Sequence, residues 1–372
     1  MHKPNGTVCH SWETSMTLRD YSLTGASSRL AQEQGLASAT WYQTDIPRKT
    51  MKALMKRSDG PAIRDTAIWL LCLVSFATAL YVSWGTLWAA LVFFCYALLY
   101  GTASDSRWHE CSHGTAFKTP WMNNAVYYLA SFMVIREPKV WKWSHARHHT
   151  DTIVVGRDYE IMGHRPTRVL RHMLAMVGVP QTWGTLKSLV RHAGGRLSAD
   201  EQSFIPSMEQ ASVFRTARVM LVLYALCIGL AVGFQSWYLA LILGPLPAMG
   251  GVWLAYVFGL TQHAGLAENV LDHRQNCRTI YMNPVFRFLY WNMNYHIEHH
   301  MFPMVPYHQL PALHQLMKHD CPPVYCSTWS AFKEVVAAMW QQRKDPDHYV
   351  RREPPQNPAE DIATTTMATQ TA

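Results

Sequence analysis

Three groups of histidines have the spacing that metal sites use. They are His109-Glu-Cys-Ser-His113, His145-Ala-Arg-His148-His149 and His296-Ile-Glu-His299-His300. On an α-helix, residues three and four apart lie on one face, so each group can direct its imidazoles towards one point. Eight imidazoles exceed the four ligands of a tetrahedral zinc ion and suit two metal ions, each with an open position. Imidazole binds iron, copper, nickel and zinc, so the ligand type alone does not identify the metal.

A two-metal site rich in neutral nitrogen, set beside apolar helices, is suited to binding and reducing dioxygen. Activated oxygen can abstract hydrogen from an unactivated C–H bond, and iron supports this chemistry whereas zinc has no redox chemistry. The reaction needs electrons. The sequence contains no CxxCH, no GxGxxG and no four-cysteine ferredoxin run, which are the motifs of haem, dinucleotide and iron–sulfur binding. A separate electron donor is therefore expected.

Two glutamates lie inside these groups, and the first creates an alternative. His109-Glu110 with His113 also fits HExxH, in which two histidines hold zinc and the glutamate activates water in a protease. A zinc protease needs one further ligand and leaves the other two groups unexplained. In a two-metal site, Glu110 and Glu298 would instead accept the free ring N–H of ligand histidines, or be solvated helix charges. A His-rich metal transporter is a third alternative, but the apolar spans contain no histidine before His263.

The elements that must position these histidines are membrane helices. The chain has 372 residues, of which 49% are apolar and 16% charged, against roughly 25% charged in soluble domains. Two stretches, 66–104 and 219–262, carry no charged side chain. The first predicts a helical hairpin, Thr66–Val82 and Leu87–Ala103, because each arm approaches the length that crosses a bilayer. The second breaks near Gln235-Ser236, and its second arm is distorted at Gly244-Pro-Leu-Pro247.

The charge pattern predicts the orientation in the membrane. Neither hairpin turn carries Lys or Arg, so both termini and the long middle segment are expected in the cytoplasm, with all three histidine groups. The predicted fold is an all-α integral membrane protein: four transmembrane helices as two hairpins, with a cytosolic helical cap that holds the metals. The eight cysteines are scattered without CxxC, which favours a reducing compartment. The net charge of +8 favours anionic lipid or an acidic electron donor, and no nucleic-acid motif is present.

The remaining segments complete the expected domain organisation. It comprises a cytosolic N-terminal segment (1–65), the membrane domain (66–320), a C-terminal cytosolic helix region (321–351) and a disordered tail (352–372). Basic Ile46–Arg57 either lies on the membrane face or is a solvated helix. We expect Val126–Ile135 and Met173–Val190 in the interface or the cap, a polar loop at Gly194–Ser207 and a helix at Ser330–Gln342.

Three longer motifs resemble those of a known family. They are His109-Glu-Cys-Ser-His-Gly-Thr-Ala-Phe117, Trp143-Ser-His-Ala-Arg-His-His149 and Asn294-Tyr-His-Ile-Glu-His-His-Met-Phe-Pro303. In this order around two apolar hairpins, they resemble the membrane fatty acid desaturase and hydroxylase superfamily over roughly residues 65–320. The resemblance implies a cytosolic diiron site, O2 as oxidant, and electrons from a ferredoxin or cytochrome b5 with its reductase. It carries metal ligation onto His109, His113, His145, His148, His149, His296, His299 and His300.

The resemblance also implies one more ligand near the end of the last span. His263 fits this position best, and His273 is the alternative. The segment at 35–48 is weakly similar to bacterial members acting on small polar substrates, as in rhizopine breakdown. The predicted function is O2-dependent desaturation or hydroxylation of a lipid acyl chain in a bacterial inner membrane. Hydroxylation or demethylation of a small polar substrate is the alternative, because the placement of the C–H bond decides the outcome.

Overall fold

The computed structural model describes residues 19–355, and the regular secondary structure of this part is helical, with two isolated β-bridges in its loops. Four helical stretches are long and apolar enough to cross a membrane: Arg48–Val82, Trp88–His113, Ser207–Gly233 and Trp237–His263. The predicted all-α membrane fold with four spans is therefore confirmed. The first 18 residues of the expected N-terminal segment, and the expected disordered tail from residue 356 onwards, lie outside the described residues.

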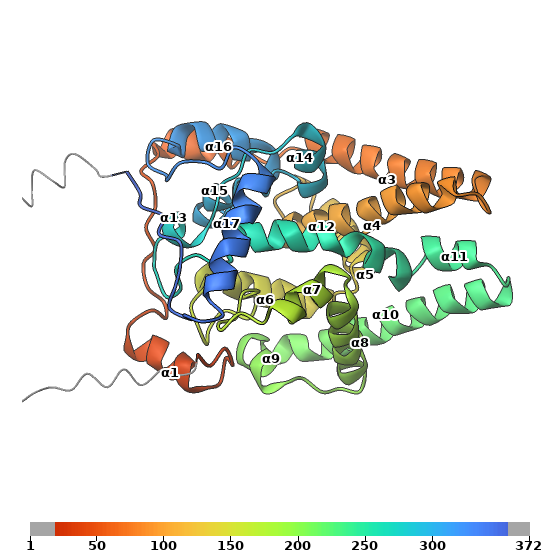
Figure 1. Ribbon diagram of the computed structural model, residues 1–372, viewed down its shortest axis with the longest axis horizontal. Coiled ribbons are helices and arrows are strands. Elements are labelled where there is room, and N and C mark those ends of the chain that lie inside the picture. The colour runs from red at the N-terminus through yellow and green to blue at the C-terminus, as the bar shows by residue number, and fades with distance from the viewer. Residues whose placement is uncertain (1–18, 356–372) are drawn as a thin grey trace, which may run out of the picture.

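The helices of the first half are α1 (Ala26–Glu33), α2 (Arg48–Leu54), α3 (Asp59–Val82), α4 (Trp88–His113), α5 (Pro120–Met133), α6 (Pro138–Thr150), α7 (Val169–Met176), α8 (Val179–Ala193) and α9 (Ala199–Phe204). Those of the second half are α10 (Ser207–Gly233), α11 (Trp237–Ile242), α12 (Pro245–His263), α13 (His273–Asn276), α14 (Pro284–Tyr290), α15 (His296–Met301), the 3-10 helix η1 (Tyr307–Gln309), α16 (Leu310–Met317) and α17 (Thr328–Gln341). In Figure 1, α3, α4, α10 and α11 extend towards one end of the molecule, and α1, α13, α15 and α16 lie at the other.

The first pair of spanning helices is longer than the uncharged stretch predicts. Helix α3 begins at Asp59, seven residues before the predicted start. Helix α4 continues ten residues beyond Ala103 and ends at His113, where Gly114 has a φ of +68°. A glycine in this left-handed conformation is a common helix stop because it has no Cβ. The first histidine group therefore lies on the last turns of a spanning helix, which fixes its position relative to the membrane segment.

The second pair is interrupted where the sequence predicts. Helix α10 begins at Ser207 and ends at Gly233. The returning arm is divided into α11 and α12 at Gly244, whose φ is +72°, and Pro245 begins α12. Proline fits the first turn of a helix because its nitrogen needs no partner there. Large apolar side chains on α3 and α10 are exposed, including Leu71 at 65% and Val222 at 60%, as expected of lipid-facing surfaces.

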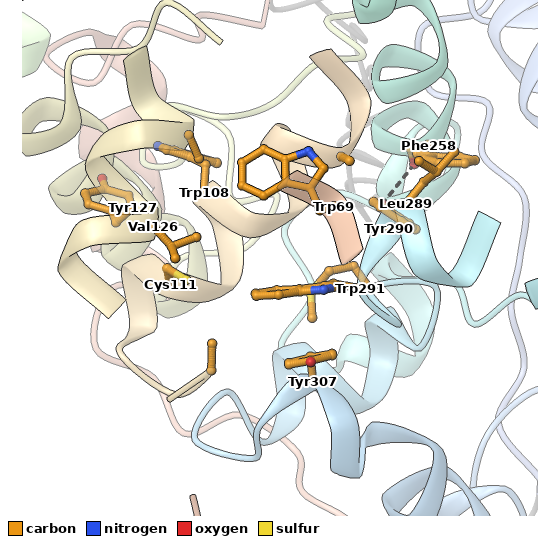
Figure 2. Packing of buried hydrophobic residues seen from close by; sticks show 14 of the residues in the cluster. Trp69, Trp108, Cys111, Val126, Tyr127, Phe258, Leu289, Tyr290, Trp291 and Tyr307 are labelled. Atoms are coloured by element: carbon orange, nitrogen blue, oxygen red, sulfur yellow. Dashed lines mark hydrogen bonds between the residues drawn. The ribbon is translucent and has the colours of Figure 1, made fainter. Parts of the chain in front are cut away.

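The core joins the spans to the short helices. Helix α4 packs against α3, α5, α12 and α14. Close packing with α12 depends on glycine, because a Cβ at Gly251 would lie 1.8 Å from the carbonyl oxygen of Ala97. Trp69, Trp108 and Trp291 are buried in one cluster with their neighbours (Figure 2). Such burial of large aromatic side chains is a major source of stability.

One connecting segment differs from its prediction. The stretch Gly194–Ser207, expected to be a polar loop, contains helix α9. The side chain of Ser198 accepts a hydrogen bond from the amide of Glu201, and the Glu201 carboxylate accepts one from the amide of Ser198. This capping box satisfies two free amides at a helix start and explains why a polar segment becomes helical. The predictions at 126–135, 173–190 and 330–342 correspond to α5, to α7 with α8, and to α17.

Candidate metal centre

The histidine groups come together as two clusters of ring nitrogens. The first cluster is formed by His109 and His113 of α4, His145 and His149 of α6, and His299 of α15. The second is formed by His148 of α6, His263 of α12, and His296 and His300 of α15. Within each cluster, the candidate ligand atoms lie within 4.8 Å of one another. The two clusters include all eight histidines of the three groups, together with His263. Distant parts of the chain therefore converge on two adjacent points.

Helical spacing decides which cluster each histidine joins. In α6, His145 and His149 are four residues apart and face the first cluster, whereas His148 faces the second. In α15 the arrangement is reversed, since His296 and His300 face the second cluster and His299 the first. The sequence predicts one target for each group, but the second and third groups are each divided between two. A pair at i, i+4 shares a face more closely than a residue at i+3, because 3.6 residues make a turn.

The geometry of facing imidazoles tests whether a metal ion fits. The Nε2 atoms of His109 and His299 are 2.7 Å apart, and those of His263 and His296 are 2.9 Å apart. Nitrogens at adjacent corners of an octahedral ion with bonds of about 2.1 Å are separated by about 3.0 Å. Within the described residues, neither ring nitrogen of His149 has a hydrogen-bond partner. Buried polar atoms normally have partners, so these nitrogens fit metal ligation.

The chemistry of the donors supports the same interpretation. Burial is the largest cause that lowers the pKa of His149, His299 and His300 well below the usual value, and neighbouring histidines add to it. These imidazoles are therefore neutral near pH 7, which is the state that binds a metal. The two clusters are adjacent, because the rings of His149 and His300 stack with centroids 4.3 Å apart. The arrangement fits two neighbouring ions held mainly by neutral nitrogen.

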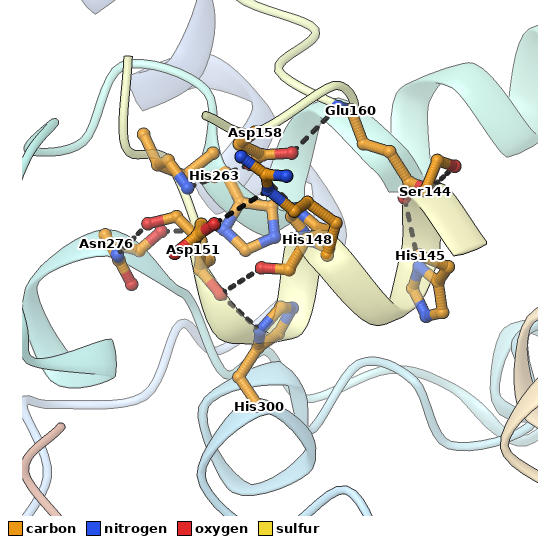
Figure 3. Close-up of polar contacts among 12 residues, drawn as sticks. Ser144, His145, His148, Asp151, Asp158, Glu160, His263, Asn276 and His300 are labelled. Atoms are coloured by element: carbon orange, nitrogen blue, oxygen red, sulfur yellow. Dashed lines mark hydrogen bonds and ion pairs between the residues drawn. The ribbon is translucent and has the colours of Figure 1, made fainter. Parts of the chain in front are cut away.

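Two carboxylates orient two of the three histidines of α6 (Figure 3). The Nδ1 of His145 lies 3.0 Å from Oε2 of Glu160, and the Nδ1 of His148 lies 2.8 Å from Oδ2 of Asp158. Burial alone would raise the pKa of Glu160, but the attraction of His145 and its hydrogen bond lower it to about 2. Burial likewise opposes charge on His148, yet Asp158 raises its pKa. With Nδ1–H directed at a carboxylate, each ring presents Nε2 to its cluster.

Polar groups outside the three histidine groups orient two further imidazole rings. The backbone carbonyl of Asn276 lies 2.8 Å from Nδ1 of His263. The hydroxyl of Thr152 donates to the carbonyl of His148 at 2.7 Å, and its oxygen lies 3.1 Å from Nδ1 of His300. Sequence reasoning missed Thr152, Asp158, Glu160 and Asn276. A usable signal for Asp158 and Glu160 was their position, within 15 residues after the second histidine group.

The two glutamates that the sequence singles out lie elsewhere. Glu110 accepts hydrogen bonds from the hydroxyl of Thr115 and the amide of Tyr307. Glu298 accepts from the hydroxyl of Thr279 and is paired with Nδ1 of His314 at 2.5 Å. Among the described residues, no hydrogen bond joins either carboxylate to a histidine of the three groups, so their ligand-orienting role stays a prediction. The alternative of solvated helix charges is wrong, because both side chains are 0% exposed. Both glutamates instead tie their helices to neighbouring segments.

The position of Glu110 also bears on the protease alternative. A zinc protease requires this carboxylate to face the water held by the metal. Here the side chain is fully buried and turned to Thr115 and Tyr307. His109 and His113 moreover share their cluster with three other histidines. This geometry does not fit the protease mechanism.

The two candidates for the additional ligand are both near the centre. His263 is within the second cluster, whereas His273 forms a smaller group with Cys277 and His300. The Sγ of Cys277 lies 3.9 Å from Nδ1 of His273 and 3.6 Å from Nδ1 of His263. Cys277 was not expected near the histidines, because a lone cysteine carries no spacing signal.

Comparison with known proteins agrees with this centre. Residues 83–332 match the family model described as "Fatty acid desaturase". This range covers more than half of the chain and includes all three histidine groups. The chain is also similar to a fatty acid conjugase of Calendula officinalis, with 25% identity over 269 residues that cover 61% of this chain and 69% of that protein.

Proposed function

Since this chain belongs to the fatty acid desaturase family, we propose that it is an O2-dependent diiron oxidoreductase that desaturates or hydroxylates a lipid acyl chain. The observation that carries the proposal is the pair of adjacent clusters of neutral imidazoles at the ends of apolar helices. Bound iron would supply the activation of dioxygen for attack on an unactivated C–H bond. Nitrogen donors suit iron, and an oxygen reaction requires a redox-active metal.

The ligand set that we propose divides between the two ions as the two clusters do. One ion would be held by His109, His113, His145, His149 and His299, and the other by His148, His263, His296 and His300. Glu160 and Asp158 would keep the protons of His145 and His148 on Nδ1, so that Nε2 remains free to bind. Burial of these rings would exclude bulk water from the reacting atoms.

The overall reaction explains why a donor is needed. In desaturation, the substrate loses two hydrogen atoms with their two electrons. A donor supplies two more electrons and the solvent two protons, so that O2 is reduced to two molecules of water. In hydroxylation, one oxygen atom enters the substrate and the other becomes water. We propose a ferredoxin or cytochrome b5 with its reductase as the donor, because the sequence carries no motif for an electron-carrying cofactor.

An acyl chain is the substrate that the surroundings favour. Helices α4 and α12 carry three of the histidines at their ends, and both belong to stretches apolar enough to cross a bilayer. A substrate held in the lipid could approach the centre along such helices. The similar protein from Calendula officinalis is named a fatty acid conjugase, which supports the same class of substrate over a small polar one.

The proposal is tested by metal analysis and lipid analysis together. The protein, purified in mild detergent, should contain about two irons per chain, and its expression should add unsaturated or hydroxylated acyl chains to host lipids. His148→Ala and His299→Ala each remove a proposed ligand from a different ion and should abolish both results. His319→Ala, an exposed histidine outside both clusters, is the matched control. Full activity in either ligand variant, or zinc in place of iron in the active protein, would overturn the proposal.

A further inference from the structure

A stacked pair of aromatic rings connects the surface to the second cluster. The indole of Trp41 lies on the imidazole of His273, with ring centroids 4.3 Å apart and planes 5° apart. The ring of His273 is in turn 5.2 Å from that of His300. Trp41 is partly exposed, whereas His273 is only 3% exposed. An unbroken series of rings therefore leads from solvent to a proposed metal ligand.

The segment that carries Trp41 is held firmly in this position. The indole Nε1 donates to the carbonyl of Thr150 at 3.1 Å, and the amide of Tyr42 donates to the carbonyl of Leu271 at 2.9 Å. The hydroxyls of Tyr42 and Thr44 both donate to one carboxylate oxygen of Asp320, at 2.7 and 2.6 Å. These bonds attach the segment to three separate parts of the fold. Trp41 is thus a fixed element of the centre and not a loose surface residue.

We infer that Trp41 and His273 form the route by which electrons enter the metal centre, and that an acidic one-electron carrier protein docks over Trp41. The inference rests on the proposed function, which requires externally supplied electrons. In each transfer, a reduced iron–sulfur or haem carrier would lose one electron, and His300 would pass it to an oxidised iron ion that this residue helps to hold. Trp41 and His273 stay neutral and unchanged, because they provide closely spaced orbitals between donor and acceptor.

The location of Trp41 favours a protein partner over lipid. The extended segment between α1 and α2 runs along the end of the molecule opposite to the tips of α3 and α10 (Figure 1). A soluble carrier approaching that end meets this segment, whereas the bilayer surrounds the apolar helices at the other.

The charges near this segment indicate an acidic carrier. Arg48, Lys49 and Lys52 follow it directly on α2, and they outnumber Asp45, the one exposed acid of the segment 41–47. All three bases are exposed, and no ion pair joins any of them to another described residue. Unpaired bases beside a docking position attract an acidic partner and increase its rate of association. The net charge of +8 acts in the same direction.

The electron route is tested by the reduction of the oxidised, iron-loaded protein in a stopped-flow instrument. Two reductants are compared: a reduced plant-type ferredoxin or cytochrome b5, and the small reductant dithionite. In Trp41→Leu, reduction by the carrier should slow by about tenfold or more, while the iron content and reduction by dithionite stay unchanged. Trp329→Leu removes an exposed tryptophan of α17 that does not touch the centre and should behave as wild type.

The docking face is tested separately with metal-free protein, so that activity plays no part. Thr150 is exposed, and its carbonyl holds the indole of Trp41. Thr150→Glu should weaken binding of the acidic carrier by about tenfold at low salt, and Thr150→Lys, which is of similar size, should not weaken it. At high salt, which screens charge, the two variants should bind the carrier with similar affinity.

The outcomes separate this inference from the proposed function. Unchanged reduction by the carrier in Trp41→Leu, or an equal loss of reduction by carrier and dithionite, would overturn the electron route. Equal binding by the Thr150→Glu and Thr150→Lys variants at low salt would overturn the docking face. Either result leaves iron content and lipid oxidation by the wild-type protein intact. A wild-type protein that binds no iron would overturn the proposed function and the inference together.

Discussion

At the scale of single residues, the site combines neutral imidazoles with a few oriented protons. Some ring nitrogens have no hydrogen-bond partner among the described residues, as at His149. Others face the nitrogen of a second imidazole, as in the pairs His109–His299 and His263–His296. The opposite nitrogens of His145, His148 and His263 meet a carboxylate or a carbonyl. This division fixes the tautomer of these three rings, because one nitrogen must carry the proton and the other the lone pair.

The carboxylates behind the rings are expected to control metal affinity. Asp158→Asn keeps the size of the side chain but weakens the hydrogen bond to His148. Loss of such a supporting group typically lowers metal affinity by about 10–100-fold. The measurement is the iron retained during titration with a chelator. Asp45→Asn, at an exposed position, should retain iron like the wild type, and equal retention by both variants would contradict the assigned role.

The metal-free protein should become less stable as the pH falls. Burial is the largest cause that lowers the pKa of His149, His299 and His300 in the folded chain. The unfolded chain takes up these protons below a pH of about 6.5, whereas the folded chain does not. Stability is therefore fully present above that pH and is lost as the pH decreases. Thermal unfolding of chelator-treated protein in detergent, between pH 8 and pH 5, measures this, and a constant melting temperature would contradict it.

At the scale of elements, the centre depends on how closely four helices approach one another. Helices α4 and α12 each end in a histidine of the site, His113 and His263. Their separation is set by Gly101 and Gly251, which allow backbone to contact backbone. Helix α6 is begun by Glu137, whose carboxylate accepts the amide of Val140 at 2.6 Å, with Pro138 in the first turn. Such fixed starts and close contacts limit how far each ring can shift relative to the others.

Substitution at the helix contact should therefore affect the metal centre from a distance. In Gly251→Ala, the new Cβ would lie 1.8 Å from the carbonyl oxygen of Ala97, so α4 and α12 must move apart. We expect a loss of about 1–3 kcal/mol of stability, as in other overpacked cores, and a lower iron content. Melting temperature in detergent and iron analysis measure the two effects.

The matched control lies on α10. A Cβ at Gly229 meets nothing within 4 Å. Gly229→Ala should leave the iron content unchanged and stabilise the helix by up to about 1 kcal/mol. Similar destabilisation of both variants would show that the effect of Gly251→Ala does not arise from the contact between α4 and α12.

At the scale of the whole molecule, the apolar helices and the polar centre occupy opposite ends. The turn between α3 and α4 and the turn between α10 and α11 lie at the far end from α13, α15 and α16 (Figure 1). We therefore predict that both turns face one side of the membrane and that the centre faces the other. Because neither turn carries Lys or Arg, we further predict that the centre is on the cytoplasmic side.

Labelling with a membrane-impermeant maleimide tests this orientation. The natural Cys326 is exposed, and it follows Tyr325, whose backbone is bonded to Thr279 and Tyr281 close to the centre. Thr86 and Phe234 are exposed beside the two turns. In sealed inside-out vesicles of a Cys9→Ser protein, Cys326 should react, and cysteines introduced by Thr86→Cys or Phe234→Cys in a Cys9→Ser, Cys326→Ser background should not. In intact spheroplasts the pattern should reverse. Labelling of all three positions from one side would exclude the proposed topology.

The sequence alone determined which residues are available for chemistry and which segments are apolar. Uncharged stretches predict spans because lipid excludes charge, and the spacing of His145, His148 and His149 predicts one helix face because the helical period is fixed. The break at Gly244-Pro245 followed from the missing amide of proline. These are local properties, and each can be read without knowing what lies nearby in space.

Only the tertiary structure decided how the local pieces combine. It divided α6 and α15 between two clusters, brought Asp158 and Glu160 behind the rings, and turned Glu110 and Glu298 away from them. It also laid Trp41 on His273, more than 200 residues away in the chain. No periodicity encodes these contacts, because they depend on the packing of separate helices, in which a shift of one ångström changes which nitrogens meet.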